Sequence, residues 1–475
     1  MLLEIPDTFK EAARCLDLLL SLTQAVCAAA SRCETFDYAD LERALAVGTG
    51  AVEAALHALV LAAMVRDDRR LMIGGVLHRP VILAQADFQT RTGAVPIARW
   101  LYRPIGDNSA PTVDPVALQV GAVRGTWLPA VAENMAFLMQ QSPAHEAETT
   151  ARQLQVLPYS DSSFRRVTLA LGERYAQHLD KIEPALIALY RVPEQATGVT
   201  VSLDRVSVRL VEPRKKPPGR PRKNAPKRPK ACVWRMAYCA TITLHDKNGR
   251  GLHTIRYGAM PNCDREGLVN ALLADVKALL GHRNDLSVEV VCDGGQEMWN
   301  LLDPAFCEEK LKCAVRKLVD LWHLLGYVGK ALRVHYDEQR ASQEFSRWKL
   351  RLLNQPKAAE RLLAELESWS RTMRSVEVDG EAPVMRAITF IRNQVAAGRV
   401  DYAGARRAGQ PVGSGHVEAS CKSLINVRFK RSGASWCEEN AEHVVNLRAL
   451  ALSERWDLAM RLLRAEARVE VRRAA

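Results

Sequence analysis

The chain has 475 residues, of which 48% are hydrophobic and 25% charged, as is usual for soluble globular proteins, and its length allows two to four domains. No uninterrupted apolar run reaches membrane-spanning length, and the first twenty residues are amphipathic and contain acids, so we expect neither a membrane anchor nor a signal peptide. The eleven scattered cysteines form no CxxC pair, which argues against a disulfide or zinc framework and favours reduced thiols in a cytoplasm.

The net charge of +12 is concentrated in one segment. Residues 213–230 contain nine Lys or Arg and no acid, so the rest of the chain carries only +3. This pattern predicts a flexible arm that grips a polyanion, with a solvated linker as the alternative.

The first 104 residues are predicted to be helical and then extended. Apolar spacing indicates a long helix over 6–33, two short helices over 38–46 and 50–63 separated by a glycine-containing turn, and a hairpin over 69–83. Two short helices and a hairpin are the parts of a winged helix, a DNA-binding unit, although a plain helical core with a hairpin fits equally well. Residues 87–104 are predicted to be extended.

A boundary rich in Pro, Gly and Asn follows at 105–115, and residues 116–190 are predicted to be mostly helical. One helix ends before Pro158, and Ser160 or Asp161 can cap the next. This pair is a second candidate for a DNA-binding helix-turn-helix.

The central region predicts a mixed sheet. Gly198–Leu210 (GVTVSLDRVSVRL) alternates like a half-buried strand and carries Asp204 at its middle, where carboxylates are rare. Strands over 233–245 and 250–258 should meet at a tight Asn-Gly turn, before a helix over 263–280 and a strand that ends at Asp293. A crossover helix normally makes the last strand parallel to the first, so we expect Asp293 beside Asp204.

The chain after Asp293 is predicted to be helical over 304–333, 340–370 and 381–397, with another helix starting near Ser414 and amphipathic helix over 434–475. Asp320 and His323 are spaced i, i+3 on the first of these helices and would share a face. Glu418 falls in the first turns of the helix that starts near Ser414.

Three carboxylates, Asp204, Asp293 and Glu418, thus stand on three separate elements. Mg²⁺ prefers carboxylate oxygens, and two such ions about 4 Å apart are a common device for phosphoryl transfer. Each residue alone has a more ordinary explanation: an edge-strand charge, a turn aspartate and a helix N-terminal acid.

Four stretches resemble the motifs of bacterial insertion-sequence transposases of the DDE class: SLDRVSV, VVCDGGQEMWNLL, VDLWHLLGYVGKAL and VGSGHVEASCKSLINVRFKRSGASW. The resemblance covers about 196–460. It implies an RNase H-like α/β core with three antiparallel strands, a helix and a parallel strand. It also implies Mg²⁺, replaceable by Mn²⁺, bound by Asp204, Asp293 and Glu418, with Asp320 and His323 as an auxiliary pair and 294–412 as a helical insertion.

Two features depart from that family. Positions 67–104 contain no Cys, so the zinc ribbon of related proteins is absent from this stretch. The basic arm looks added to the core, and its KPPGRPRK piece resembles an AT-hook in which Pro218 replaces the usual Arg. Minor-groove insertion of Arg220, with Arg222 and Lys223 beside it, is one hypothesis, and non-specific phosphate binding is the other.

Further cations surround the third carboxylate. We expect Lys422, Arg428, Lys430 and Arg431 to contact DNA phosphates, whereas Trp299 and Trp436 are better explained as core aromatics than as platforms for an extruded base.

Together these observations predict a DNA transposase that acts on terminal inverted repeats and target DNA as a homodimer or larger assembly, in a bacterial cytoplasm near the nucleoid. The expected domains are 1–104, 105–195, 196–450 and a C-terminal helix over 451–475. The alternatives are a non-catalytic DNA-binding regulator derived from such an enzyme, and an RNase H-like nuclease.

Overall fold

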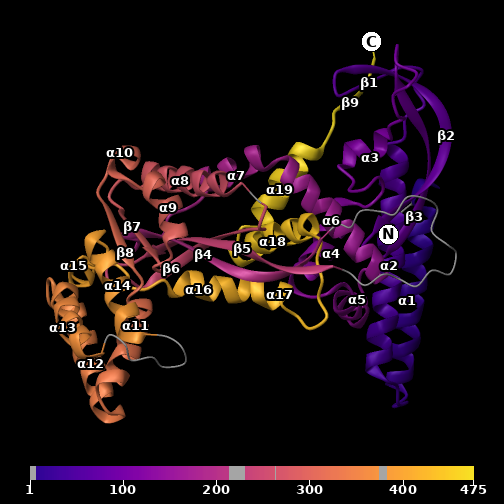
Figure 1. Ribbon diagram of the computed structural model, residues 1–475. Helices are drawn as coiled ribbons and strands as arrows, with labels where there is room; N and C mark the ends of the chain where they lie inside the picture. Colours follow the sequence, from indigo (N-terminus) through magenta and orange to yellow (C-terminus); the bar gives the residue numbers. More distant parts are fainter. Residues whose placement is uncertain (1–6, 213–230, 263, 374–381, 475) are drawn as a thin grey trace. The chain divides into compact units, whose positions relative to one another are not determined.

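The computed structural model describes residues 7–212, 231–262, 264–373 and 382–474, and the chain forms two compact units (Figure 1). Unit 1 comprises residues 1–182 and 457–475, and unit 2 comprises residues 183–456. The two predicted domains 1–104 and 105–195 therefore form mainly one unit. The reason lies in backbone hydrogen bonds that join the early hairpin to the later helices, for example from Leu157 N to Arg91 O at 3.0 Å.

Unit 1 combines helices with an antiparallel sheet in the order β3-β2-β1-β9. Its elements are α1 (Lys10–Ser31), α2 (Tyr38–Ala63), β1 (Leu71–Ile73), β2 (Val76–Thr90), β3 (Gly93–Pro104), α3 (Pro115–Val120), α4 (Pro129–Gln141), α5 (Ala144–Gln153), α6 (Asp161–Gln177), α19 (Trp456–Ala467) and β9 (Val471–Arg473). Helix α7 (Leu179–Ala188) contains the boundary between the units. The predicted helix over 451–475 is wrong at its end, because β9 pairs with β1.

The predicted break between two short helices at 47–49 is wrong, because α2 is one helix of 26 residues. Ala and Leu surround Gly48 and Gly50 and carry the helix through them. The glycines serve close packing instead: Leu19 of α1 occupies the space where a Cβ of Gly48 would lie, and Thr92 packs at Gly50. Residues 38–83 thus lack the two helices that the winged-helix interpretation required.

The hairpins of unit 1 also differ from the prediction. A short hairpin joins β1 to β2 at Gly74 and Gly75, which both have positive φ, and β2 then pairs with β3 over its whole length. The predicted hairpin over 69–83 and the extended segment over 87–104 are parts of this arrangement. Helices α5 and α6 are joined by seven residues, 154–160, longer than the three- to four-residue turn of a helix-turn-helix.

Unit 2 is built on a five-stranded sheet in the order β6-β5-β4-β7-β8. The strands are β4 (Gly198–Val211), β5 (Cys232–His245), β6 (Gly251–Ala259), β7 (Ser287–Cys292) and β8 (Val315–Val319). Strands β4, β5 and β6 are antiparallel neighbours, whereas β7 is parallel to β4 and β8 is parallel to β7. The predicted hairpin, crossover helix and parallel return beside the first strand are confirmed.

Helices cover both faces of this sheet, with α8 and α9 on one side and α16 and α17 on the other (Figure 1). The helices of unit 2 are α8 (Arg265–His282), α9 (Gln296–Ala305), α10 (Glu308–Leu311), α11 (Leu321–His335), α12 (Glu338–Asn354), α13 (Ala358–Met373), α14 (Pro383–Ala396), α15 (Tyr402–Arg407), α16 (Gly415–Ser420), the π-helical segment η2 (Cys421–Asn426), α17 (Val427–Phe429) and α18 (Glu438–Leu452). Strand β4 is therefore not half-buried as predicted, because Thr200 and Ser202 are buried as well as Val201.

The predicted helix over 304–333 is wrong, because strand β8 interrupts it. The backbone of this short run pairs with β7. Its apolar and β-branched side chains, Val315, Leu318 and Val319, pack against the sheet and the helical insertion. The insertion thus begins after Asp320 rather than at 294. The predicted helix over 340–370 is also two helices, separated at Lys357, which has a φ of +55°.

Candidate functional site

Three aspartates stand at equivalent positions of neighbouring parallel strands, one within β4 and two just after the ends of β7 and β8. Thr200 of β4 is paired with Glu289 of β7, and Glu289 with Arg316 of β8. Four residues further along each strand stand Asp204, Asp293 and Asp320. Because side chains alternate between faces and parallel strands keep their register, these three aspartates belong to one row on one face of the sheet.

The row lies on the face opposite α8. Val199, Val201 and Leu203 of β4 pack into the core with α8 and α9, so Asp204 points to the other side, where η2 packs. Strand β4 no longer pairs with β7 beyond Val201 and Val290. Just before the aspartates, the thiol of Cys292 donates to the carbonyl of Leu203 at 2.9 Å in place of a backbone pair.

Asp204 is half-buried and held by two hydrogen bonds. The backbone N–H of Arg205 donates to its Oδ1 at 2.6 Å, and the thiol of Cys421 donates to its Oδ2 at 3.4 Å. Burial raises the pKa of Asp204, and the negative charge of Asp293 raises it further, while these hydrogen bonds and the charge of His323 lower it.

Asp293 stands at the turn from β7 into α9. Its Oδ1 accepts from Gly295 N at 3.0 Å, and its carbonyl oxygen accepts from the indole N–H of Trp299 at 3.0 Å. Gly294 is needed here because the ring of Phe390, from α14, occupies the space where its Cβ would lie. The turn therefore fixes Asp293 between the sheet and the helical insertion.

Asp320 joins two helices of the site. The prediction that Asp320 lies within a helix is wrong, because Asp320 precedes α11 as its N-cap. Its Oδ1 accepts from His323 N at 2.7 Å. Its Oδ2 accepts from the backbone N–H of Ser414 and from Ser414 Oγ, the latter at 2.8 Å. Asp320 is 1% exposed. One buried carboxylate thus clamps the start of α11 to the start of α16.

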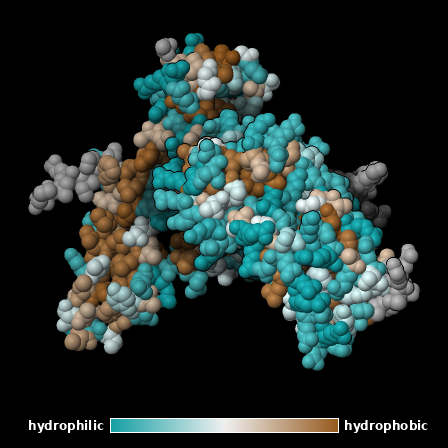
Figure 2. Space-filling view, turned by 90° about the vertical axis from the view of Figure 1, so that its left-hand side faces the viewer, coloured by the Kyte–Doolittle hydropathy of each residue, from teal (hydrophilic) through white to brown (hydrophobic). Residues whose placement is uncertain are grey.

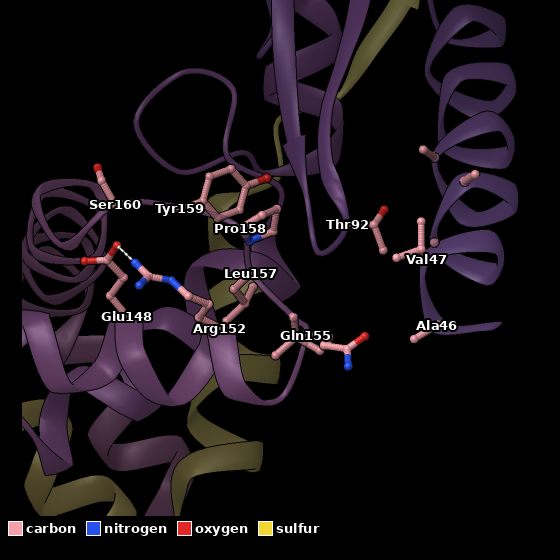
Figure 3. A pocket seen from close by; sticks show the side chains of 14 residues that line it. Ala46, Val47, Thr92, Glu148, Arg152, Gln155, Leu157, Pro158, Tyr159 and Ser160 are labelled. Carbon is pink, nitrogen blue, oxygen red and sulfur yellow. Dashed lines mark hydrogen bonds and ion pairs between the residues drawn. The ribbon is translucent and has the colours of Figure 1, made fainter. Parts of the chain in front are cut away.

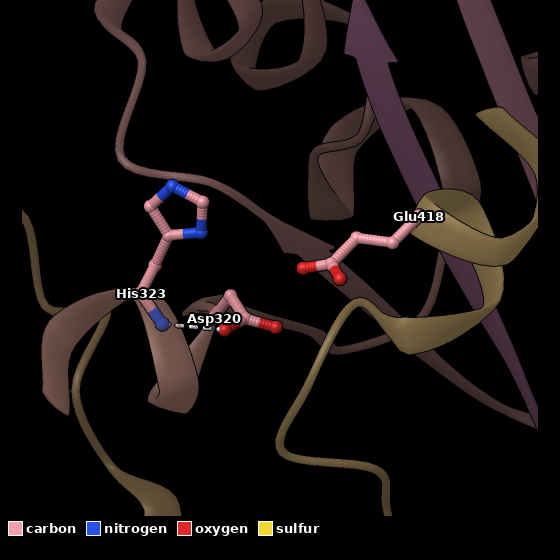
Figure 4. Close-up of side chains that lie close together, drawn as sticks. All are labelled: Asp320, His323 and Glu418. Carbon is pink, nitrogen blue, oxygen red and sulfur yellow. Dashed lines mark hydrogen bonds between the residues drawn. The ribbon is translucent and has the colours of Figure 1, made fainter. Parts of the chain in front are cut away.

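Glu418 of α16 faces this clamp. Ligand atoms of Asp320, His323 and Glu418 all lie within 4.8 Å of one another, with His323 and Glu418 exposed (Figure 4). In the part of the chain that the structure describes, this is the group of acids and histidines close enough together to hold a metal ion. The predicted triad of Asp204, Asp293 and Glu418 does not meet this distance, although Asp204 adjoins the same helical segment through Cys421.

The site can hold a hard divalent cation. Its donors are the carboxylates of Asp320 and Glu418 and the imidazole of His323, a set that a divalent cation can use. Asp320 follows the end of β8, His323 lies in the first turn of α11, and Glu418 lies in α16, whose start Asp320 clamps to α11, so regular elements set their positions. The segment after α16 is π-helical, a local irregularity that recurs at functional sites.

The predicted DNA contacts fall into three groups. Arg220, Arg222 and Lys223 lie outside the described residues. Lys422, Lys430 and Arg431 are exposed, Lys422 in η2 directly after α16 and the other two after α17. Arg428 was predicted to contact phosphates but is buried. It is 3% exposed, and its guanidinium lies 4.5 Å from the ring centre of Trp436.

The tryptophans of this region differ in how far they are buried. Trp299 is fully buried, so the prediction of a core aromatic is confirmed there, whereas Trp436 is half-buried and packs against Phe429. The sequence reasoning missed Trp322, which is 54% exposed immediately beside His323, with Lys349 Nζ 4.4 Å from its ring centre. It also missed Ser414 and Cys421. The one sequence signal that could have identified Ser414 and Cys421 as site residues is their position beside Glu418 in the same motif.

Comparisons with known proteins add little. No protein-family model and no curated protein matches the sequence. Among solved structures, one similar chain belongs to the Drosophila P element transposase strand transfer complex, with 14% identity, 71% of this chain and 82% of that chain covered, and a TM-score of 0.25. A TM-score this low does not establish a shared fold.

Proposed function

We propose that this chain is a DNA transposase of the DDE class, with an RNase H-like catalytic core in unit 2. The single observation that carries the proposal is the row formed by Asp204 in the middle of β4 and by Asp293 and Asp320 just after the ends of β7 and β8, faced by Glu418 from α16. Acids cost free energy when they gather on a partly buried surface, so such a row favours a site for cations. The motif resemblance supports the same conclusion independently.

In this proposal Asp204, Asp293 and Glu418 bind Mg²⁺, and Asp320 and His323 complete the site. Bound Mg²⁺ would neutralise the charge that develops on a phosphodiester during cleavage and strand transfer. The protein's own part is positional: Asp320 holds α16 through Ser414, and Cys421 holds the carboxylate of Asp204. His323 is exposed and would be free to contact the DNA or a water at the scissile phosphate.

DNA would be held by the exposed cations Lys422, Lys430 and Arg431 near Glu418 and by the basic arm of residues 213–230. In sequence the arm follows directly on β4, the strand that carries Asp204, and its cations would contribute a grip on the phosphate backbone.

The test is cleavage and joining of DNA that carries the sequences flanking this reading frame. With Mg²⁺, the full chain should nick both element ends and join them to a target plasmid. Asp204→Asn or Glu418→Gln should lower this activity by at least about 10³-fold while end binding in a gel-shift assay is retained. Glu439→Gln, which changes an exposed acid on α18, is the matched control and should act like wild type.

Three outcomes would contradict the proposal. Full strand transfer by either variant would refute the site. Binding of DNA ends without metal-dependent cleavage by the wild-type chain would indicate the non-catalytic regulator. Cleavage of many DNAs or RNA–DNA hybrids without joining would indicate a nuclease.

A further inference from the structure

Helices α1 and α2 of unit 1 leave large apolar side chains in water. Leu18 is 64% exposed and Val47 is 72% exposed. The other large apolar side chains exposed on or beside the pair are Phe9, Leu16, Leu20, Phe36, Tyr38, Leu56 and Val60. Figure 2 shows this apolar surface running along an elongated arm, which corresponds to α1 and α2 in Figure 1. A contiguous apolar surface of this kind marks an interaction site.

A groove runs between the two helices on this surface. It encloses about 400 Å³ and is lined by Cys15, Leu18 and Leu22 of α1 and by Ala44, Val47 and Ala51 of α2. Protruding leucines and recessed alanines thus lie side by side on the same face. A surface that carries both a ridge and a groove can pack against its own copy about a two-fold axis.

Both helices are long and apolar enough to cross a membrane, a property that the sequence prediction did not anticipate. The surroundings of α2 argue against a membrane. At its middle, Glu53 accepts from Arg91 at 2.6 Å, and Gly50 contacts Thr92. Arg91 and Thr92 form the tip of the β2–β3 hairpin, and Figure 3 shows Thr92 facing α2. A charged pair and a hairpin tip at mid-helix are costly in hydrocarbon. We therefore expect the occupant of this surface to be protein.

The size of the surface fits a dimer. Helices of 22 and 26 residues are roughly 33 and 39 Å long, and two packed helices form a strip roughly 20 Å wide. Covering one side of the strip buries about 700 Å² on each copy, or about 1,400 Å² in all, which lies within the range of stable protein–protein interfaces.

We propose that α1 and α2 bind the same two helices of a second copy of this chain, so that four helices form a bundle at the dimer interface. From Leu18 to Ser31, helix α1 carries no charged side chain, so little opposes close packing there. This inference does not rest on the proposed activity of unit 2.

The test is the mass of the full chain in solution, measured by light scattering over a range of protein concentrations. Wild type should have about twice the chain mass of 52.8 kDa. Leu18→Glu and Val47→Glu should each raise the dissociation constant at least about 100-fold, because a two-fold interface doubles the effect of each change. Leu350→Glu, at a 60% exposed leucine of α12, is the matched control and should remain dimeric.

Circular dichroism must show unchanged helix content in each variant, which the exposure of both positions makes the expected result. A wild-type chain that is monomeric at all concentrations would overturn the proposal, as would dimers that persist in both folded variants. Flotation of a monomeric wild type with phosphatidylglycerol vesicles, lost in both variants, would overturn it in favour of a membrane surface.

Discussion

The sheet of unit 2 and the helix pair of unit 1 use apolar residues in opposite ways. In unit 2, strands β4 and β7 are buried on both faces and hold a row of acids, with Asp204 within β4 and Asp293 just after β7. In unit 1, helices α1 and α2 are just as regular, but their apolar side chains remain in water. The buried sheet fixes the positions of polar side chains that can take part in chemistry. The exposed apolar side chains of α1 and α2 instead form a surface that a partner can cover.

The largest effect should come from the buried clamp of unit 2. Asp320→Asn keeps an N-cap for α11 but places an amide where Ser414 N–H must find an acceptor. We expect a loss of about 2–3 kcal/mol in the free energy of unfolding and about 10²-fold in metal-dependent cleavage. Urea denaturation and the cleavage assay measure the two effects.

Asp337→Asn is the matched control, because Asp337 caps α12 in the same way but is exposed. It should change neither quantity appreciably. Equal losses of unfolding free energy and of cleavage in the two variants would show that the burial of Asp320 contributes to neither.

The second prediction concerns Glu289, which is buried in the same sheet, four residues before Asp293. Burial raises the pKa of Glu289 to about 8 from 4.5. Between these values the folded chain binds one more proton than the unfolded chain, so the free energy of unfolding falls as pH rises from about 4.5 to 8. Glu289→Gln should remove this loss, which amounts to about 3 kcal/mol between pH 5 and pH 7.

The measurement is the difference between wild type and Glu289→Gln in the free energy of unfolding at several pH values. A difference that does not grow with pH would show that Glu289 is ionised in the folded chain. Glu360→Gln, at an exposed acid of α13, should give a difference that stays constant.

The smallest effect should come from the contact within the helix pair. Gly48→Val places a Cβ and two methyl groups where Leu19 of α1 packs. We expect a loss of about 1–3 kcal/mol in the free energy of unfolding, because the two helices must move apart. In Gly281→Ala, at a helix position with open space around it, we expect no loss. Thermal unfolding of both variants tests whether α1 and α2 pack as closely as described.

The sequence predicted the parts of unit 2 that follow from local rules. Alternation located β4, the Asn-Gly step located the β5–β6 hairpin, and the crossover rule placed β7 beside β4, so the neighbourhood of Asp204 and Asp293 was foreseen. Strand β8 was missed because five residues between helical patterns give too short a signal. Without β8, Asp320 was assigned to a helix, and its role as a clamp could not be derived.

Long-range packing explains the remaining errors. Gly48 and Gly50 indicated a turn by their type, yet their lack of a side chain serves contacts with Leu19 and Thr92, which lie far away in the sequence. The bonds from Cys421 to Asp204 and from Ser414 to Asp320 join segments more than ninety residues apart. Patterns within a window of residues do not contain such contacts.

The central claim, that the acid row with Glu418 binds a divalent cation, is tested most directly by Mn²⁺ titration calorimetry of the full chain without DNA. We predict that wild type and Glu439→Gln bind Mn²⁺ alike. Asp204→Asn, Asp293→Asn and Glu418→Gln should each weaken binding at least about tenfold, since each removes one anionic ligand. Equal binding by the wild-type chain and all three variants would contradict the account.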